Sequence, residues 1–285
     1  MAKRKSANKI ILAVLLIAGG ILSCWCALKL LPNRLIIPDD VVSFKQVQSD
    51  DLKADLFLPD TEGQKNIGII CFFGGGWQSG NRRQLRRLAR DLKEDGYVVA
   101  CVDYRTGNEY GVEPKDCVAD GKSAVRWFRS QADRYGFKRN QIIAVGISAG
   151  AHVAAATAML PNFEHHDDDF TVSCRPNRLI LISPVLDTGP GGFGYNRVRD
   201  YAEAFSLEAH FSNEMPQTLI LLGNNDEITS VKVAERFQQG MKDQGVSCQL
   251  GVLNGANHSF FLNKINKSGY EWAMVEIKSF LEKAR

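Results

Sequence analysis

Short apolar runs alternate with longer segments along most of the 285-residue chain. The runs are rich in β-branched residues, which predicts buried strands. These strands are expected at residues 66–73, 97–102, 142–147, 179–182, 218–222 and 249–253. The longer segments are either rich in alanine or carry apolar residues three or four positions apart, which predicts helices. These helices are expected at residues 82–94, 114–135, 149–160, 231–244 and 270–284.

Near the start of this pattern, residues 41–47 and 52–58 alternate apolar with polar side chains, which predicts a hairpin at the edge of a sheet. Strands that alternate with helices predict a mostly parallel sheet covered by helices on both faces. We therefore expect one α/β domain over residues 41–285. The glycine-rich segment 187–212 interrupts the pattern and is a candidate lid or substrate wall.

Residues 1–30 form a separate leader. Four cations precede the uncharged stretch 10–28, the layout of an export signal. Three outcomes stay open: cleavage near Cys26, lipidation at Cys24, or retention as a membrane anchor, since 19 residues can span a bilayer. Each exports the domain, and membrane contact is expected only through this segment.

The composition and the charge of the chain limit the classes of protein to which it can belong. Hydrophobic residues make up 45% and charged residues 24% of the chain, as in a globular protein. The formal charge of +3 falls to −1 without the four leader cations, so no nucleic-acid partner is expected. Five cysteines beyond the leader form no complete disulfide framework, although one disulfide among Cys117, Cys174 and Cys248 stays open.

The candidate nucleophile is Ser148. It lies in a Gly-x-Ser-x-Gly sequence between an expected strand and an expected helix, the context of a nucleophile elbow. A serine on so sharp a turn is strained, and Gly146 and Gly150 allow the strand and the helix to pack closely.

A serine needs a base, and His258 follows the last expected strand, at the sheet edge where sites of parallel sheets gather. An acid should hold that histidine, and Asp226 follows the preceding strand in a similar loop. Asp187 is the rival acid and Glu227 a weaker one. His152, on the helix that follows Ser148, is expected to pack or to form a polar contact, and His210 lies in the irregular segment, where it could approach substrate.

His165 and His166 precede Asp167, Asp168 and Asp169 in a polar loop. A metal site is one interpretation of this sequence. A solvated loop is favoured because no expected strand or helix would fix the ligand geometry, so no metal is predicted.

Three consecutive glycines between Phe73 and Trp77 directly follow a buried strand. Their backbone N–H groups, with that of Ala149 at a helix start, can hold an oxyanion. Loss of one such donor costs on the order of 3 kcal/mol of barrier in comparable sites.

Together these residues resemble the α/β-hydrolase superfamily, in its esterase/lipase branch with a His-Gly-Gly-Gly-Trp loop. Segments 103–105, 123–127, 223–226 and 255–261 are similar to exported bacterial esterases related to acetyl-xylan esterases. The resemblance implies Ser148 as nucleophile, Asp226 as acid and His258 as base. It implies Gly74, Gly75 and Ala149 as oxyanion donors.

Two positions depart from the family pattern. Phe73 stands where many relatives have histidine, which removes a polar contact under the loop but leaves the backbone donors. Ile147 replaces an acidic residue of the Gly-Asp-Ser-Ala-Gly subgroup, so that subgroup's substrates are not assumed.

The expected function is a serine carboxylester hydrolase that acts through an acyl-enzyme and needs no cofactor. The resemblance and the leader favour small-molecule or polysaccharide substrates with short acyl groups, acetyl above all. Trp77, Phe193 and Tyr195 are candidates to contact substrate, with core packing as the alternative for each. A peptidase or amidase with the same triad, and an exported binding protein on a hydrolase scaffold, remain the rival functions.

Overall fold

The computed structural model describes residues 35–48, 50–262 and 267–283. The chain forms two compact units, Met1–Ile37 and Pro38–Arg285. The account below concerns the second unit. The predicted leader, with Cys24 and Cys26, lies outside the described residues. Among the described residues, no helix combines the length and apolar character needed to cross a bilayer.

An eight-stranded sheet runs through this unit in the order β1-β2-β4-β3-β5-β6-β7-β8. β1 (Asp40–Val47) and β2 (Asp50–Phe57) pair antiparallel at one edge, so the predicted hairpin is confirmed. β2 also pairs antiparallel with β4, and every later pairing is parallel. The other strands are β3 (Gly68–Phe72), β4 (Val98–Val102), β5 (Ile142–Ile147), β6 (Arg178–Ile182), β7 (Gln217–Asn225) and β8 (Cys248–Asn257).

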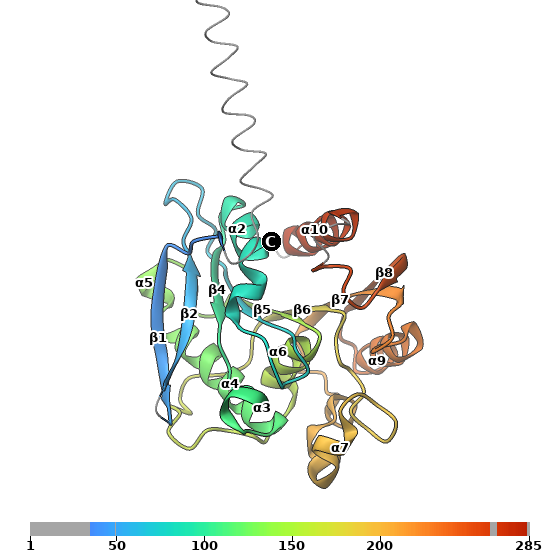
Figure 1. Ribbon diagram of the computed structural model, residues 1–285. Helices are drawn as coiled ribbons and strands as arrows, with labels where there is room; N and C mark the ends of the chain where they lie inside the picture. Colours follow the sequence, from blue (N-terminus) through green and yellow to red (C-terminus); the bar gives the residue numbers. More distant parts are fainter. Residues whose placement is uncertain (1–34, 49, 263–266, 284–285) are drawn as a thin grey trace, which may run out of the picture. The chain divides into compact units, whose positions relative to one another are not determined.

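Helices cover both faces of the sheet (Figure 1). One face carries α2 (Arg86–Glu94) and α10 (Lys267–Glu282), which are joined by a 2.6 Å hydrogen bond from Tyr270 to Asp91. The other face carries α4 (Pro114–Ser130), α6 (Ala149–Met159) and α9 (Val231–Asp243). Because helices cover both of its faces, β3, β4 and β5 are buried along their whole length, as their apolar sequences predict.

Short helical elements lie between these main ones. The helix expected over 114–135 is interrupted at Gln131, and α5 (Ala132–Tyr135) follows as a separate turn. The segment 187–212 is less irregular than its glycines suggest, because buried side chains such as Phe205 and Leu207 order four short turns within it. These turns are α7 (Tyr195–Val198), η3 (Arg199–Tyr201), α8 (Ala202–Phe205) and η4 (Leu207–His210), and two others are η2 (Arg82–Leu85) and α3 (Gly107–Tyr110).

The two last strands are longer than the sequence pattern predicts. β7 and β8 stay paired up to Asn225 and Asn257, past an irregularity after Gly223. A side chain at Gly223 would lie 2.0 Å from the carbonyl oxygen of Ala256, so only glycine permits this close approach. The extension brings the ends of both strands side by side at the same edge of the sheet.

All five described cysteines are buried free thiols: Cys71, Cys101, Cys117, Cys174 and Cys248. The disulfide that the sequence left open among the last three is therefore not formed in the structure.

Candidate active site

Ser148 lies on a sharp turn between β5 and α6, with a backbone φ of 55° and ψ of −123°. This strained conformation is the one predicted for a nucleophile elbow. A Cβ at Gly146 would lie 2.2 Å from the carbonyl oxygen of Gly150, and a Cβ at Gly150 would lie 2.0 Å from that of Phe73. The two glycines are therefore required by backbone packing, and the serine between them is partly exposed at the strand end.

The structure brings Ser148, His258 and Asp226 into one hydrogen-bonded chain. His258 Nε2 lies 2.9 Å from Ser148 Oγ. His258 Nδ1 lies 2.9 Å and 3.0 Å from the two carboxylate oxygens of Asp226. With Nδ1 protonated, Nε2 is the free acceptor that faces the serine proton, which is the arrangement of a serine nucleophile with its base.

The ends of β7 and β8 place the acid beside the histidine. Asn225 and Asn257 are paired across the two strands, so the residues that follow them, Asp226 and His258, emerge next to each other. The sequence pattern ended both strands too early to show this.

Asp226 is held as a carboxylate. Its side chain is fully buried and accepts hydrogen bonds from the backbone N–H groups of Ile228 at 2.8 Å and Thr229 at 2.9 Å. Burial by itself would raise the pKa of Asp226, but the hydrogen bonds from His258 and the two amides outweigh it and hold that pKa below its ordinary value. The carboxylate is therefore ionised at neutral pH and can stabilise an imidazolium.

The rival residues lie in other interactions. Asp187 forms an ion pair with Arg236 at 3.0 Å and accepts a hydrogen bond from the Gly189 N–H at 2.9 Å. Glu227 is exposed, and His210 Nε2 lies 3.3 Å from the carbonyl oxygen of Ala204. Neither acid contacts His258.

His152 packs in the interior beneath the elbow, as expected. It is fully buried, its ring stacks on Phe205 at 4.4 Å, and it meets the Trp77 ring edge-on at 5.2 Å. Burial lowers the pKa of His152 to about 4, so the ring is neutral at physiological pH.

The loop of residues 73–77, called the oxyanion loop below, corrects one expected donor. The Gly74 N–H donates to Gln84 Oε1 at 2.6 Å and is not free for a substrate. The N–H groups of Gly75, Gly76 and Ala149 have no hydrogen-bond partner among the described residues. The free donors are therefore Gly75, Gly76 and Ala149 rather than Gly74, Gly75 and Ala149.

Gln84, in η2, is a positioning residue that the sequence did not reveal, because nothing in a polar helical turn marks a contact ten residues away. Gln84→Met removes the acceptor for Gly74 at similar volume and leaves the loop less fixed. We expect kcat to fall about 10- to 100-fold with a small change in KM, because misplaced donors weaken transition-state binding most. Gln239→Met, on the exposed face of α9, is the matched control, and equal kcat in the two variants would contradict the role.

Phe73 stands where many relatives have histidine, and other contacts replace the polar contact that is lost. Its ring stacks on Tyr104 with centroids 4.0 Å apart and planes 4° apart, and the Tyr104 hydroxyl donates to the Phe73 carbonyl at 2.8 Å. An apolar stack and a tyrosine hydroxyl thus hold the start of the oxyanion loop.

The three candidate substrate contacts differ in exposure. Trp77 is fully buried, so it cannot stack on a sugar, and core packing is its role in the structure. Phe193 is partly exposed and covers Trp77 with ring centroids 5.8 Å apart. Tyr195, at the start of α7, is also partly exposed, and its contact with substrate stays a prediction.

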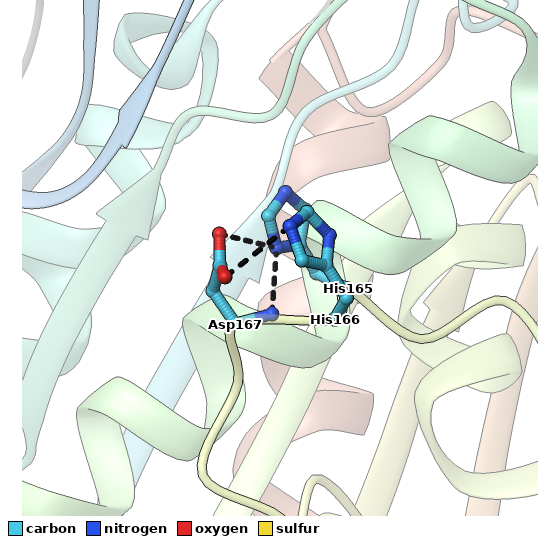
Figure 2. Close-up of side chains that lie close together, drawn as sticks. All are labelled: His165, His166 and Asp167. Atoms are coloured by element: carbon cyan, nitrogen blue, oxygen red, sulfur yellow. Dashed lines mark hydrogen bonds and ion pairs between the residues drawn. The ribbon is translucent and has the colours of Figure 1, made fainter.

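Figure 2 shows the polar cluster of His165, His166 and Asp167, whose ligand atoms lie within 4.8 Å of one another. The two imidazoles are stacked, with centroids 4.8 Å apart and planes 21° apart. Imidazole lone pairs lie in the ring plane, so stacked rings do not aim at a common point. The side chains of His166 and Asp167 are 84% and 74% exposed. We therefore assign no metal to this cluster.

The sequence favours a solvated loop here because no expected strand or helix would fix its geometry. Ion pairs nevertheless hold the loop that carries this cluster in place. Arg126 forms ion pairs with Glu164 at 2.7 Å and Asp168 at 2.9 Å, and buried Lys122 pairs with Glu164 at 2.8 Å. The buried cations thus fix a segment that has no strand or helix of its own.

Comparison with known proteins identifies the family of this chain. A family model described as BD-FAE matches residues 54–190. Esterase 2 of Thermogutta terrifontis, in its apo form, is 34% identical, with a TM-score of 0.81 over 86% of this chain and 94% of that one. This chain belongs to the esterases of the α/β-hydrolase superfamily.

Two curated relatives have lower identity to this chain. A probable isoprenylcysteine α-carbonyl methylesterase of Oryza sativa is 25% identical over 80% of this chain. An acetylxylan esterase of Xylanibacter ruminicola is 24% identical over 74% of it. The chain spans 60% and 45% of the length of these two relatives.

Proposed function

We propose that this esterase hydrolyses carboxylic esters through a covalent acyl-enzyme on Ser148. The observation that carries the proposal is the unbroken chain of hydrogen bonds from Ser148 Oγ through His258 to Asp226. Relatives named as esterases support it, and structures of Thermogutta esterase 2 include a form phosphonylated by sarin.

In the first half of the reaction, His258 Nε2 takes the proton of Ser148 as its oxygen attacks the ester carbonyl. The N–H groups of Gly75, Gly76 and Ala149 hold the oxyanion. Asp226 stabilises the imidazolium, which then gives its proton to the departing alcohol.

In the second half, His258 deprotonates a water molecule that attacks the acyl-enzyme through a second oxyanion intermediate. The imidazolium returns its proton to Ser148, and the free acid leaves. Each proton transfer uses a residue of this chain.

The preferred substrates in this proposal are short acyl esters, with acetylated polysaccharide as one source. The name of the Xylanibacter relative and the butyrate-bound and propionate-bound structures of Thermogutta esterase 2 support short acyl groups. We further propose that the domain acts outside the cytoplasm, which rests on the leader sequence alone.

Hydrolysis of p-nitrophenyl esters from acetate to palmitate tests the acyl preference, with acetylated xylan as a parallel substrate. We expect turnover to be highest between acetate and butyrate and to fall steeply toward palmitate, with acetate released from the xylan. A maximum at long chains would keep the mechanism and replace the substrate. Amide hydrolysis without ester hydrolysis would favour the rival peptidase function.

A further inference from the structure

Arg197, in α7, lies directly on the oxyanion loop. Its Nη1 donates a hydrogen bond to the carbonyl oxygen of Gly76. The guanidinium carbon is 5.4 Å from the centroid of the Trp77 ring and 5.7 Å from that of Phe193. The side chain is only partly exposed. Stacking on two aromatic rings fixes the guanidinium in one orientation.

This guanidinium forms no ion pair with any described residue. Partial burial lowers the pKa of Arg197, and no carboxylate opposes that effect. Other arginines pair with acidic side chains of the segment 187–212. Arg236 forms ion pairs with Asp187 and Glu208, and Arg199 forms one with Asp200. A partly desolvated charge without a counter-charge is unfavourable unless a bound anion completes it.

The position of Arg197 relates this charge to the reacting ester. Gly76, whose carbonyl oxygen it binds, carries one of the free oxyanion donors, and Gly75 is the adjacent residue. Through this hydrogen bond the guanidinium is attached to the segment that supplies two of the three free oxyanion donors. A Cβ at Gly194 would lie 3.1 Å from Arg197 Nη2, so the backbone of the segment also confines the guanidinium.

A guanidinium has five N–H donors, and the contact with Gly76 uses one of the groups. The remaining donors form the planar fork that binds a carboxylate through two parallel hydrogen bonds. We propose that Arg197 binds a carboxylate of the substrate, so that the esters favoured by this site carry a negative charge close to the scissile bond. This inference rests on the proposed ester hydrolysis and specifies its substrate class.

A purely structural role for Arg197 predicts a different result. If the side chain only held the Gly76 carbonyl, its loss would displace the oxyanion loop and lower kcat/KM for neutral and anionic esters by the same factor. Recognition of a carboxylate lowers kcat/KM for the anionic ester alone. The ratio between matched esters therefore separates the two roles.

Two matched pairs of esters provide this ratio in the full-length protein. The first pair is mono-p-nitrophenyl glutarate and p-nitrophenyl 5-methylhexanoate, which carry a carboxylate or an isopropyl group at the end of the acyl chain. The second pair is 4-acetoxybenzoate and 4-isopropylphenyl acetate, which make the same exchange on the alcohol. We expect the wild-type protein to favour the anionic member of one pair, and added NaCl to weaken that preference.

In Arg197→Gln, we expect the anionic-to-neutral ratio of kcat/KM for that pair to fall about 10-fold or more, the size of one charge-assisted hydrogen bond. Arg197→Lys, a point charge without the fork, should retain part of the preference. Arg199→Gln is the matched control, because Arg199 is the next arginine along the chain and its side chain is 66% exposed. An unchanged ratio in Arg197→Gln for both pairs would overturn the proposal.

A binding measurement separates failure of this inference from failure of the proposed function. Calorimetric titration of the Ser148→Ala protein with the four esters requires no turnover. We expect the favoured anionic ester to bind more tightly than its neutral partner, and that difference to disappear in the Ser148→Ala/Arg197→Gln double variant. Equal binding within both pairs would reject the role of Arg197, whereas absent turnover in the wild type would reject ester hydrolysis alone.

Discussion

Ser148→Ala is expected to lower kcat/KM for p-nitrophenyl acetate by at least about 10⁴-fold, because no other group in the site can form the acyl-enzyme. The residual rate would come from the free oxyanion donors and the binding of substrate. Alanine has the same Cβ as serine, so it meets the same backbone constraint at a φ of 55° and should leave the melting temperature almost unchanged. The measurement is initial-rate kinetics with thermal unfolding of both proteins.

Ser259→Ala is the matched control for this variant. Ser259 follows the proposed base and is exposed, and its hydroxyl forms no hydrogen bond with a described residue. We expect it to retain wild-type turnover and to react with a fluorophosphonate probe, whereas Ser148→Ala should show neither. Esterase activity that survives in Ser148→Ala would place the nucleophile elsewhere, and absence of probe labelling in the wild type would favour a binding protein on a hydrolase scaffold.

Asp226→Asn is expected to lower kcat by about 10⁴-fold, as in comparable triads. Asparagine keeps the shape of the side chain, but its amide group can donate to His258 Nδ1. The neutral histidine would then carry its proton on Nε2, where it cannot accept the proton of Ser148. We expect KM to change little, because Asp226 is buried behind the histidine and is too distant to bind substrate.

Asp187→Asn tests the other acid that the sequence offered. Asp187 pairs with Arg236 at 3.0 Å and does not contact His258, so its loss should change kcat by less than about threefold, as expected for an exposed ion pair. A large loss in Asp187→Asn with a small one in Asp226→Asn would reverse the assignment.

The sequence predicted those features that depend on local chemistry. The elbow at Ser148 was predictable because a sharp strand-to-helix turn requires small flanking residues, and Gly146 and Gly150 stand on either side of the serine. The α/β fold was predictable because buried parallel strands must be apolar on both faces, as β3, β4 and β5 are. The position of His258 followed from the rule that sites gather at the carboxyl ends of such strands.

The tertiary structure decided which polar groups are already satisfied. Asp187 and Asp226 both follow strands at the same edge, and only the pairing of Asn225 with Asn257 places one of them beside His258. The sequence does not distinguish the backbone N–H groups of Gly74 and Gly76. In the structure, the Gly74 N–H donates a hydrogen bond to Gln84, whereas that of Gly76 is free among the described residues. Burial likewise decided between the two roles that the sequence left open for Trp77. These outcomes depend on contacts between residues distant in sequence, which periodicity and local motifs do not encode.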